Sequence, residues 1–170
     1  NVNQRADAYG GGISGRNRFA LEVARATAAA VGAHRVGIRL SPYGVFNSTG
    51  AFADVEAQYL ALTEKLSELG LLYLHLLDHS AMGAPPVPAE FKLQVRQAFK
   101  GLFILAGGFD RAGAQSALKA GQADLIAFAR PFLANPDLVK RMQTDAALNA
   151  ADMATFYTPG PKGYTDIPAM

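Results

Sequence analysis

The feature that most constrains the fold of this chain is a stretch in which an apolar run, a tight turn and a helix follow one another twice. The two runs are Leu102–Ala106 and Asp124–Ala129, and glycine or polar residues bound each of them. This order, repeated after about 22 residues, is typical of two consecutive parallel β/α units. The turns then lie at the carboxyl ends of the strands, where such folds bind ligands.

The residues of these two turns favour an anion site. The first turn contains Gly107 and Gly108, and the second contains Ala129 and Arg130. Paired glycines let the backbone approach an anion and direct N–H groups at it, and an arginine adds a fixed cation. Two plainer interpretations stay open: an ordinary tight turn at the glycines, and a surface salt bridge at Arg130.

The same pattern extends to the rest of the chain. Apolar runs at 36–40 and 71–77 predict two further strands. Apolar residues at helical spacing predict five helices, over 16–32, 54–70, 89–99, 110–121 and from Asn135, which would be the N-cap. We expect a single partial domain over 1–170, with a loop and helix at 1–32, four β/α units at 33–150 and a tail at 151–170. Such a domain is either a small open α/β sheet or half of a (β/α)8 barrel, which typically takes about 250 residues.

Composition argues against several classes of function. The net charge of +2, without a stripe of Lys or Arg, predicts no nucleic-acid partner. There is no cysteine, which excludes disulfides and thiolate metal sites and is compatible with the cytoplasm, where we expect the protein. No apolar run approaches the roughly 20 residues of a membrane span, so we expect no membrane association. The chain begins at Asn1 rather than methionine, which is compatible with a fragment, a processed product or part of a longer protein.

The three histidines do not form a metal-binding pattern. His34 precedes a predicted strand, and His75 and His79 lie four residues apart in a region that does not read as a helix. No carboxylate or third ligand is clustered with them, so we predict no metal site. Lys119 and Lys140 are expected to be solvated on outer helix faces.

Motifs along nearly the whole chain, in order and at matching spacing, resemble the C-terminal half of the old yellow enzyme family of FMN-dependent ene-reductases. The matching segments are Asn3-Gln4-Arg5, Tyr9-Gly10-Gly11, Arg16-Asn17-Arg18-Phe19, Gly37-Ile38-Arg39-Leu40-Ser41-Pro42, Tyr73-Leu74-His75-Leu76, Ala106-Gly107-Gly108-Phe109-Asp110, Ala129-Arg130-Pro131-Phe132, Asn135-Pro136-Asp137-Leu138, Thr155-Phe156-Tyr157 and Gly163-Tyr164-Thr165-Asp166. The resemblance implies strands five to eight of a (β/α)8 TIM barrel. Gly12, Ser14 and Gly15 depart from the family pattern and remove a helix-starting cap.

The resemblance also implies roles for particular residues. Arg39 would lie beside N1 and O2 of the flavin and stabilise the negative charge of its reduced form. The FMN phosphate would be bound by the two turns, through Gly107, Gly108, Ala129 and Arg130. Tyr157 would contact substrate. The plainer alternatives are an ion pair at the barrel rim for Arg39 and a packing aromatic for Tyr157; Tyr164 is expected to be structural.

The implied activity is transfer of a hydride from NADPH or NADH through FMN to the C=C bond of an α,β-unsaturated carbonyl or nitro compound. No catalytic residue is expected in this chain, since the proton-donating tyrosine of the family would lie upstream. The expected partners are a small activated alkene and an N-terminal half-barrel on the same gene product or on a second chain. Two alternatives remain: a non-catalytic half-barrel that binds flavin or phosphate, and an unrelated barrel fragment that binds a sugar phosphate.

Overall fold

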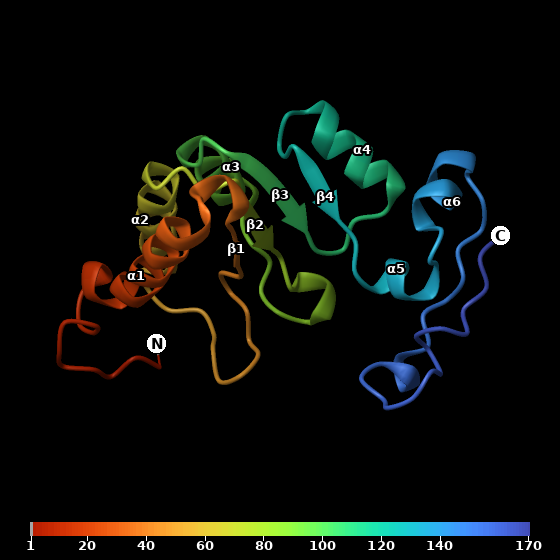
Figure 1. Ribbon diagram of the computed structural model, residues 1–170, viewed down its shortest axis with the longest axis horizontal. Helices are drawn as coiled ribbons and strands as arrows, with labels where there is room; N and C mark the ends of the chain where they lie inside the picture. The colour runs from red at the N-terminus through yellow and green to blue at the C-terminus, as the bar shows by residue number, and fades with distance from the viewer. Residues whose placement is uncertain (1) are drawn as a thin grey trace. The chain divides into compact units, whose positions relative to one another are not determined.

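Four parallel strands run side by side in their order along the chain (Figure 1). They are β1 (Gly37–Leu40), β2 (Tyr73–Leu77), β3 (Leu102–Ala106) and β4 (Leu125–Ala127). Each falls within a range predicted from the sequence, and the pairing is parallel throughout. The prediction of a parallel α/β fold is therefore confirmed. The structure is a computed structural model that describes residues 2–170.

The helices of the fold alternate with the strands. The α-helices are α1 (Ile13–Val31), α2 (Val55–Glu68), α3 (Ala89–Ala98), α4 (Arg111–Lys119), α5 (Arg130–Ala134) and α6 (Leu138–Thr144). Single turns of 3-10 helix are η1 (Ala33–Arg35), η2 (Ser80–Met82) and η3 (Met153–Thr155). The chain divides into two compact units, Asn1–Ala127 with the whole sheet and Phe128–Met170 with α5, α6 and the tail, and each is described by itself.

One face of the sheet forms the core of the first unit. Alternate strand residues such as Leu74, Leu76, Phe103 and Leu105 are buried on it, because successive side chains of a strand point to opposite faces. Residues of α1, α2 and α3 pack against them, and the predicted apolar face of α3, with Phe91 and Val95, is fully buried. The apolar face predicted for α2 is also confirmed, since Val55, Leu62 and Leu66 are buried.

The opposite face of the sheet is much less covered. Register places Arg39, His75, Ile104 and Leu125 in one row across the four strands on this face. The side chain of Leu125 is 50% exposed, and Arg39 is also exposed. β1 and β4 each pair with a single neighbour, so both edges of the four-stranded sheet are open.

The residues that α1 buries are not the apolar residues whose spacing predicted the helix. The sequence shows apolar residues at Phe19 and Val23 at helical spacing, but their side chains are 69% and 48% exposed. Asn17 and Ala24 are buried instead, and Asn17 donates a hydrogen bond from Nδ2 to the carbonyl of Gln58 in α2 at 3.0 Å. Helix α1 begins at Ile13 with Gly12 as N-cap and without a side-chain cap, as the departure from the family pattern implied.

The prediction that Asn135 is the N-cap of the last helix is wrong. Asn135 is not the N-cap: 130–134 form the short helix α5, and Asp137 takes the N-cap position of α6. The Asn135 side chain is fully buried and bonds to the backbone of neighbouring segments. The side-chain amide of Asn135 therefore links neighbouring backbone segments to one another and does not cap a helix.

Candidate functional site

The sequence predicts ligand-binding turns after β3 and β4 and a flavin-binding arginine on β1; β1 and the turn after β3 lie in the first unit. In Figure 1 the loops that follow these strands lie at the arrowhead ends of the sheet. Arg39 is the third residue of β1, and Gly107 and Gly108 directly follow β3. All three belong to the first unit.

The turn after β3 has a backbone that suits glycine. Gly107 and Gly108 have φ angles of 123° and 67°, in the region that L side chains rarely adopt. A Cβ on Gly107 would also overlap the carbonyl oxygen of Asp78, so this turn packs directly on the loop after β2. Gly108 is exposed. A side-chain-free turn of this kind is compatible with the close approach of a phosphate.

The helix after this turn is capped by the protein itself. Asp110 Oδ1 accepts a hydrogen bond from the N–H of Gly113 at 2.7 Å and so acts as the N-cap of α4. An aspartate at the start of α4 already satisfies the helix end with a negative charge. A phosphate would therefore contact the glycine turn rather than the first turn of α4.

The loop after β2 is held by a buried ion pair that sequence reasoning missed. Asp78 is 7% exposed, and its Oδ2 lies 2.7 Å from Nζ of Lys92 in α3. The N–H groups of Ser80 and Val87 donate to the same carboxylate at 2.9 and 3.3 Å. Burial raises the pKa of Asp78, but the Lys92 and Ser80 hydrogen bonds and the Lys92 charge outweigh it, so its pKa is lowered overall. One signal in the sequence could have indicated this pair. Asp78 directly follows an apolar strand, and a carboxylate that is buried there needs a charged or hydrogen-bonding partner.

Arg39 projects from the uncovered face of the sheet. Its guanidinium forms no hydrogen bond or ion pair with any residue in 2–170, so the alternative of a structural ion pair has no partner in this part of the chain. Its neighbour in register is His75 on β2. Burial and the charge of Arg39 both lower the pKa of His75, which favours a neutral imidazole.

Tyr43 is the tyrosine closest in sequence to Arg39 at this edge of the sheet. Its hydroxyl donates a hydrogen bond to Oε1 of Glu56 at 2.6 Å. Burial and this bond raise the pKa of Tyr43 to about 12. A hydroxyl that already donates to a carboxylate and has a raised pKa is a poor proton donor.

The other predicted residues lie in the second unit. Ala129 is the N-cap residue of α5, and Arg130, partly buried, is the first residue of that helix. Tyr157 is 96% exposed with a φ of 60°, and its ring packs edge-on against Phe156. The predicted phosphate-binding residues are thus divided between the units, Gly107 and Gly108 in one and Ala129 and Arg130 in the other.

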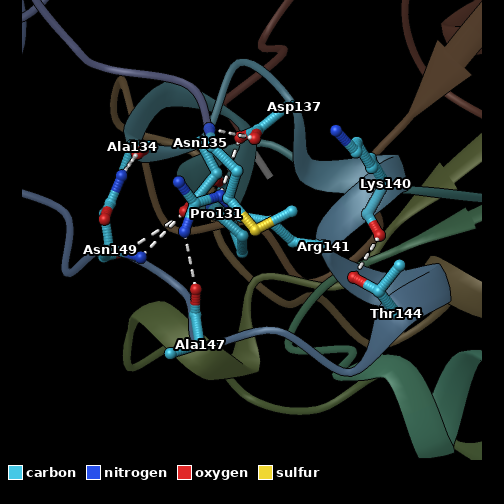
Figure 2. Close-up of polar contacts among 10 residues, drawn as sticks. Pro131, Ala134, Asn135, Asp137, Lys140, Arg141, Thr144, Ala147 and Asn149 are labelled. Carbon is cyan, nitrogen blue, oxygen red and sulfur yellow. Dashed lines mark hydrogen bonds and ion pairs between the residues drawn. The ribbon is translucent and has the colours of Figure 1, made fainter.

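The second unit is held together by a polar network that the sequence did not reveal (Figure 2). Asn135 donates to the carbonyls of Pro131 at 2.9 Å and Asn149 at 3.2 Å, and accepts from the N–H of Asn149 at 2.8 Å. Arg141, also buried, donates to Oδ1 of Asp137 and to the carbonyl of Ala147, at 2.7 and 2.6 Å. These bonds fix the segment after α6 against α5.

A cavity of about 310 Å³ lies in the same unit, between the end of α5 and the tail. Leu133, Phe156 and Ile167 supply apolar walls, and Asp152, Lys162 and Asp166 supply charges. Tyr157 is not among its lining residues. No cluster of three metal-ligating side chains occurs in residues 2–170, and no helix among them is long and apolar enough to cross a membrane.

Comparison with known proteins identifies the class to which this fold belongs. The sequence profile of the NADH:flavin oxidoreductase / NADH oxidase family matches residues 1–149. The chain is 45% identical over 172 residues to 12-oxophytodienoate reductase 2 of Arabidopsis thaliana, covering 99% of this chain and 46% of the relative. It is also 45% identical over 175 residues to putative 12-oxophytodienoate reductase 10 of Oryza sativa subsp. japonica, covering 98% and 55%.

Solved structures agree with the sequence comparison. Morphinone reductase superposes with a TM-score of 0.94 at 43% identity, over 99% of this chain and 45% of that protein. A second structure, of morphinone reductase in complex with tetrahydroNAD, gives a TM-score of 0.90 at the same identity. The matched fold is thus that of flavin-dependent oxidoreductases with a parallel α/β sheet.

The chain belongs to the NADH:flavin oxidoreductase / NADH oxidase family, whose cofactor is FMN. Its relatives named above are old yellow enzyme family members, so the predicted resemblance to that family and the prediction of FMN as cofactor are confirmed. The chain spans about half the length of the curated relatives that it matches.

Proposed function

We propose that this chain is the part of an FMN-dependent ene-reductase that forms strands five to eight of a (β/α)8 barrel. Four parallel strands with two open edges, one buried face and one poorly covered face support this interpretation. The share of each relative that is matched, 46% and 55%, also fits half of a barrel. Open sheet edges and a poorly covered face are unfavourable in water, so we expect a complementary half-barrel to pair with the edges and cover the face.

The residues of this chain would bind and polarise the cofactor. The observation that supports this role concerns Arg39. It lies on the less covered face of the sheet and has no ion-pair partner among residues 2–170. Its fixed positive charge would lie where negative charge develops on the reduced flavin. Gly107, Gly108 and the N–H of Ala129 would contact the phosphate together with Arg130.

When bound, FMN would accept a hydride from NADPH or NADH and deliver it to the β-carbon of an alkene conjugated with a carbonyl or nitro group. The α-carbon would take its proton from a tyrosine outside this chain. Tyr157, exposed on the tail, would line the substrate pocket and take no part in proton transfer. The structures with tetrahydroNAD belong to morphinone reductase and support a nicotinamide donor here by homology.

The test compares the chain alone with the chain completed by its missing strands. We would express residues 1–170 by themselves, and together with the segment of Arabidopsis 12-oxophytodienoate reductase 2 that the match does not cover. Intact mass verifies each preparation, flavin absorbance reports FMN, and NADPH oxidation with cyclohexenone reports turnover. We expect flavin and turnover only in the completed protein.

The remaining outcomes discriminate the alternatives. Appreciable turnover by the mass-verified chain alone would refute the need for a second half. Flavin colour without turnover in the completed protein would favour a non-catalytic flavin-binding module. Failure of the completed protein to take up FMN would contradict the proposal.

A further inference from the structure

The glycine turn after β3 packs on the loop that follows β2, residues 78–88. The N–H of Asp78 donates a hydrogen bond to the carbonyl of Ala106, the last residue before the turn, at 2.9 Å. A Cβ on Gly107 would overlap the carbonyl oxygen of Asp78, and a Cβ on Gly108 would come within 3.3 Å of Cβ of Ala81. The conformation of the turn therefore depends on where this loop lies.

The side chain of Asp78 holds the loop from both of its ends. Its Oδ1 accepts a hydrogen bond from the N–H of Ser80 at 2.9 Å, and its Oδ2 accepts one from the N–H of Val87 at 3.3 Å. Val87 is itself 3% exposed and belongs to the hydrophobic core. Hydrogen bonds to an ionised acceptor are stronger than those between neutral groups. A single carboxylate thus connects the start of the loop to its anchored end.

The cation that balances this carboxylate comes from a helix fixed by the core. Lys92 lies on α3, and the neighbouring side chains of Phe91 and Val95 on that helix are fully buried. The Nζ of Lys92 is 2.7 Å from Oδ2 of Asp78, and the lysine side chain is 27% exposed. Salt screens a partly buried pair much less than a surface pair. The ion pair therefore links the loop to α3.

We propose that Asp78 and Lys92 are positioning residues for the phosphate of FMN. Their ion pair fixes the loop on which the glycine turn packs, and thereby keeps the backbone N–H groups of the turn directed at the phosphate. A turn without this support would have to be ordered on binding, which costs affinity. The inference rests on the proposed function, since that function places the phosphate at this turn. Both side chains act through Gly107 and Gly108 and do not themselves contact the phosphate.

A direct effect of charge on the phosphate would give a different result from positioning. If charge alone mattered, Lys92→Met would remove a positive charge and weaken binding, whereas Asp78→Asn would remove a negative charge and strengthen it. If the pair positions the turn, both variants weaken binding, because an asparagine has one acceptor oxygen where the carboxylate of Asp78 uses two. The sign of the Asp78→Asn effect discriminates the two.

The affinity test compares FMN with riboflavin, which has no phosphate, in the completed protein. Quenching of flavin fluorescence measures both affinities, and circular dichroism verifies folding. We expect Lys92→Met and Asp78→Asn each to weaken FMN binding about tenfold and to leave riboflavin within about twofold. Lys92→Arg retains the cation and should stay within about threefold of the parent for FMN. Lys65→Met, on the exposed side of α2, is the control and should stay within about twofold.

Two results of this comparison would overturn the proposal. Equal losses of FMN and riboflavin affinity would show a general effect on stability only, and stronger FMN binding by Asp78→Asn would show an effect of charge. If Lys92→Met does not fold, Lys92→Gln takes its place in the same comparison, since its amide retains a donor for Asp78.

The position of the turn itself is measured without any ligand, by ¹H–¹⁵N NMR on the completed protein labelled at glycine. We expect Lys92→Met to shift or broaden the N–H signals of Gly107 and Gly108. Gly121, whose N–H donates to the carbonyl of Leu118 just after α4, is the internal reference and should not change. Unchanged signals of Gly107 and Gly108 would overturn the proposal.

The two proposals fail in different ways. If the parent protein binds no FMN while the signals of Gly107 and Gly108 respond to Lys92→Met, the ion pair positions the turn and the flavin function is wrong. If FMN binds and Arg130→Met weakens it while Lys92→Met does not, the flavin function stands and the positioning role is wrong.

Discussion

The ring of Tyr73 lies over Gly37, its neighbour in register, in the space that a side chain on Gly37 would occupy. Both residues belong to the less covered face of the sheet, one row before Arg39 and His75. The glycine thus makes room for an aromatic ring at the base of the candidate flavin site. This contact explains why a strand of only four residues begins with the residue least suited to strands.

Substitution of Gly37 should therefore destabilise the sheet through Tyr73. We expect Gly37→Ala to lower the free energy of unfolding by about 1–3 kcal/mol, because the new Cβ overlaps the ring and forces it to move. Urea denaturation measures the change. In a Tyr73→Ala background the same substitution should cost less than about 0.5 kcal/mol. Equal losses in both backgrounds would show that the ring is not the obstacle.

The Asp78–Lys92 pair should contribute to stability at neutral pH and less in acid. A carboxyl whose folded-state pKa is lowered stabilises the fold above its unfolded pKa, about 3.9, and the contribution is lost as pH falls through the folded-state value. Lys92→Met leaves the buried carboxylate without its cation and should cost about 1–3 kcal/mol at pH 7. The loss should shrink below pH 4, as denaturation at several pH values would reveal.

Lys65→Met is the matched control for that variant. Lys65 pairs with Glu68 three residues along the exposed side of α2, and both side chains are more than half exposed. Surface pairs of this kind contribute little, so we expect a change within about 0.5 kcal/mol. A Lys92→Met variant no less stable than Lys65→Met would contradict the structural role of the buried pair.

Asn135 should be essential for the order of the second unit. Replacing its buried amide with leucine (Asn135→Leu) removes the hydrogen bonds to the N–H of Asn149 and the carbonyl of Pro131, which should lower the free energy of unfolding by about 1–3 kcal/mol in total. Hydrogen exchange at the Asn149 amide should accelerate accordingly. Asn149→Ala removes only the bond to the Ala134 carbonyl and should have the smaller effect. The reverse order would show that the side chain of Asn149, not Asn135, holds the segment.

Arg130 should act on the phosphate of FMN and on nothing else in the cofactor. In the completed protein we expect Arg130→Met to weaken FMN binding about tenfold or more, and to leave the affinity for riboflavin, which has no phosphate, within about twofold. Quenching of flavin fluorescence measures both. Lys140→Met, at an exposed position of α6, is the control for the loss of one positive charge. Parallel loss of FMN and riboflavin affinity would argue against a phosphate contact.

Much of the fold was predictable because the strands are short apolar runs with abrupt boundaries. Leu102–Ala106 and Tyr73–Leu77 are recognisable from their composition, because each is a short, nearly continuous apolar run, which is typical of strands in a parallel sheet. The cap at Asp110 and the buried face of α3 follow from local rules as well. The family motifs then identified the class of cofactor.

The misassigned positions are those where a distant segment decides the local outcome. Phe19 and Val23 form an apolar stripe, yet α1 turns Asn17 and Ala24 inward because the Asn17 amide reaches a carbonyl on α2. Asparagine is a preferred N-cap residue, yet the Asn135 side-chain amide bonds to the backbone of Asn149, fourteen residues later. Spacing along one helix contains no information about such partners.

The sequence by itself determined the order of the elements, the parallel sheet and the family, because these depend on local patterns and motifs. Only the tertiary structure decided that Arg39 and His75 share one row of the inner face and that Asp78 packs under Gly107. Register and burial are properties of assembled strands: each depends on which residue of a neighbouring strand lies opposite, and that is settled when the whole sheet packs against its helices.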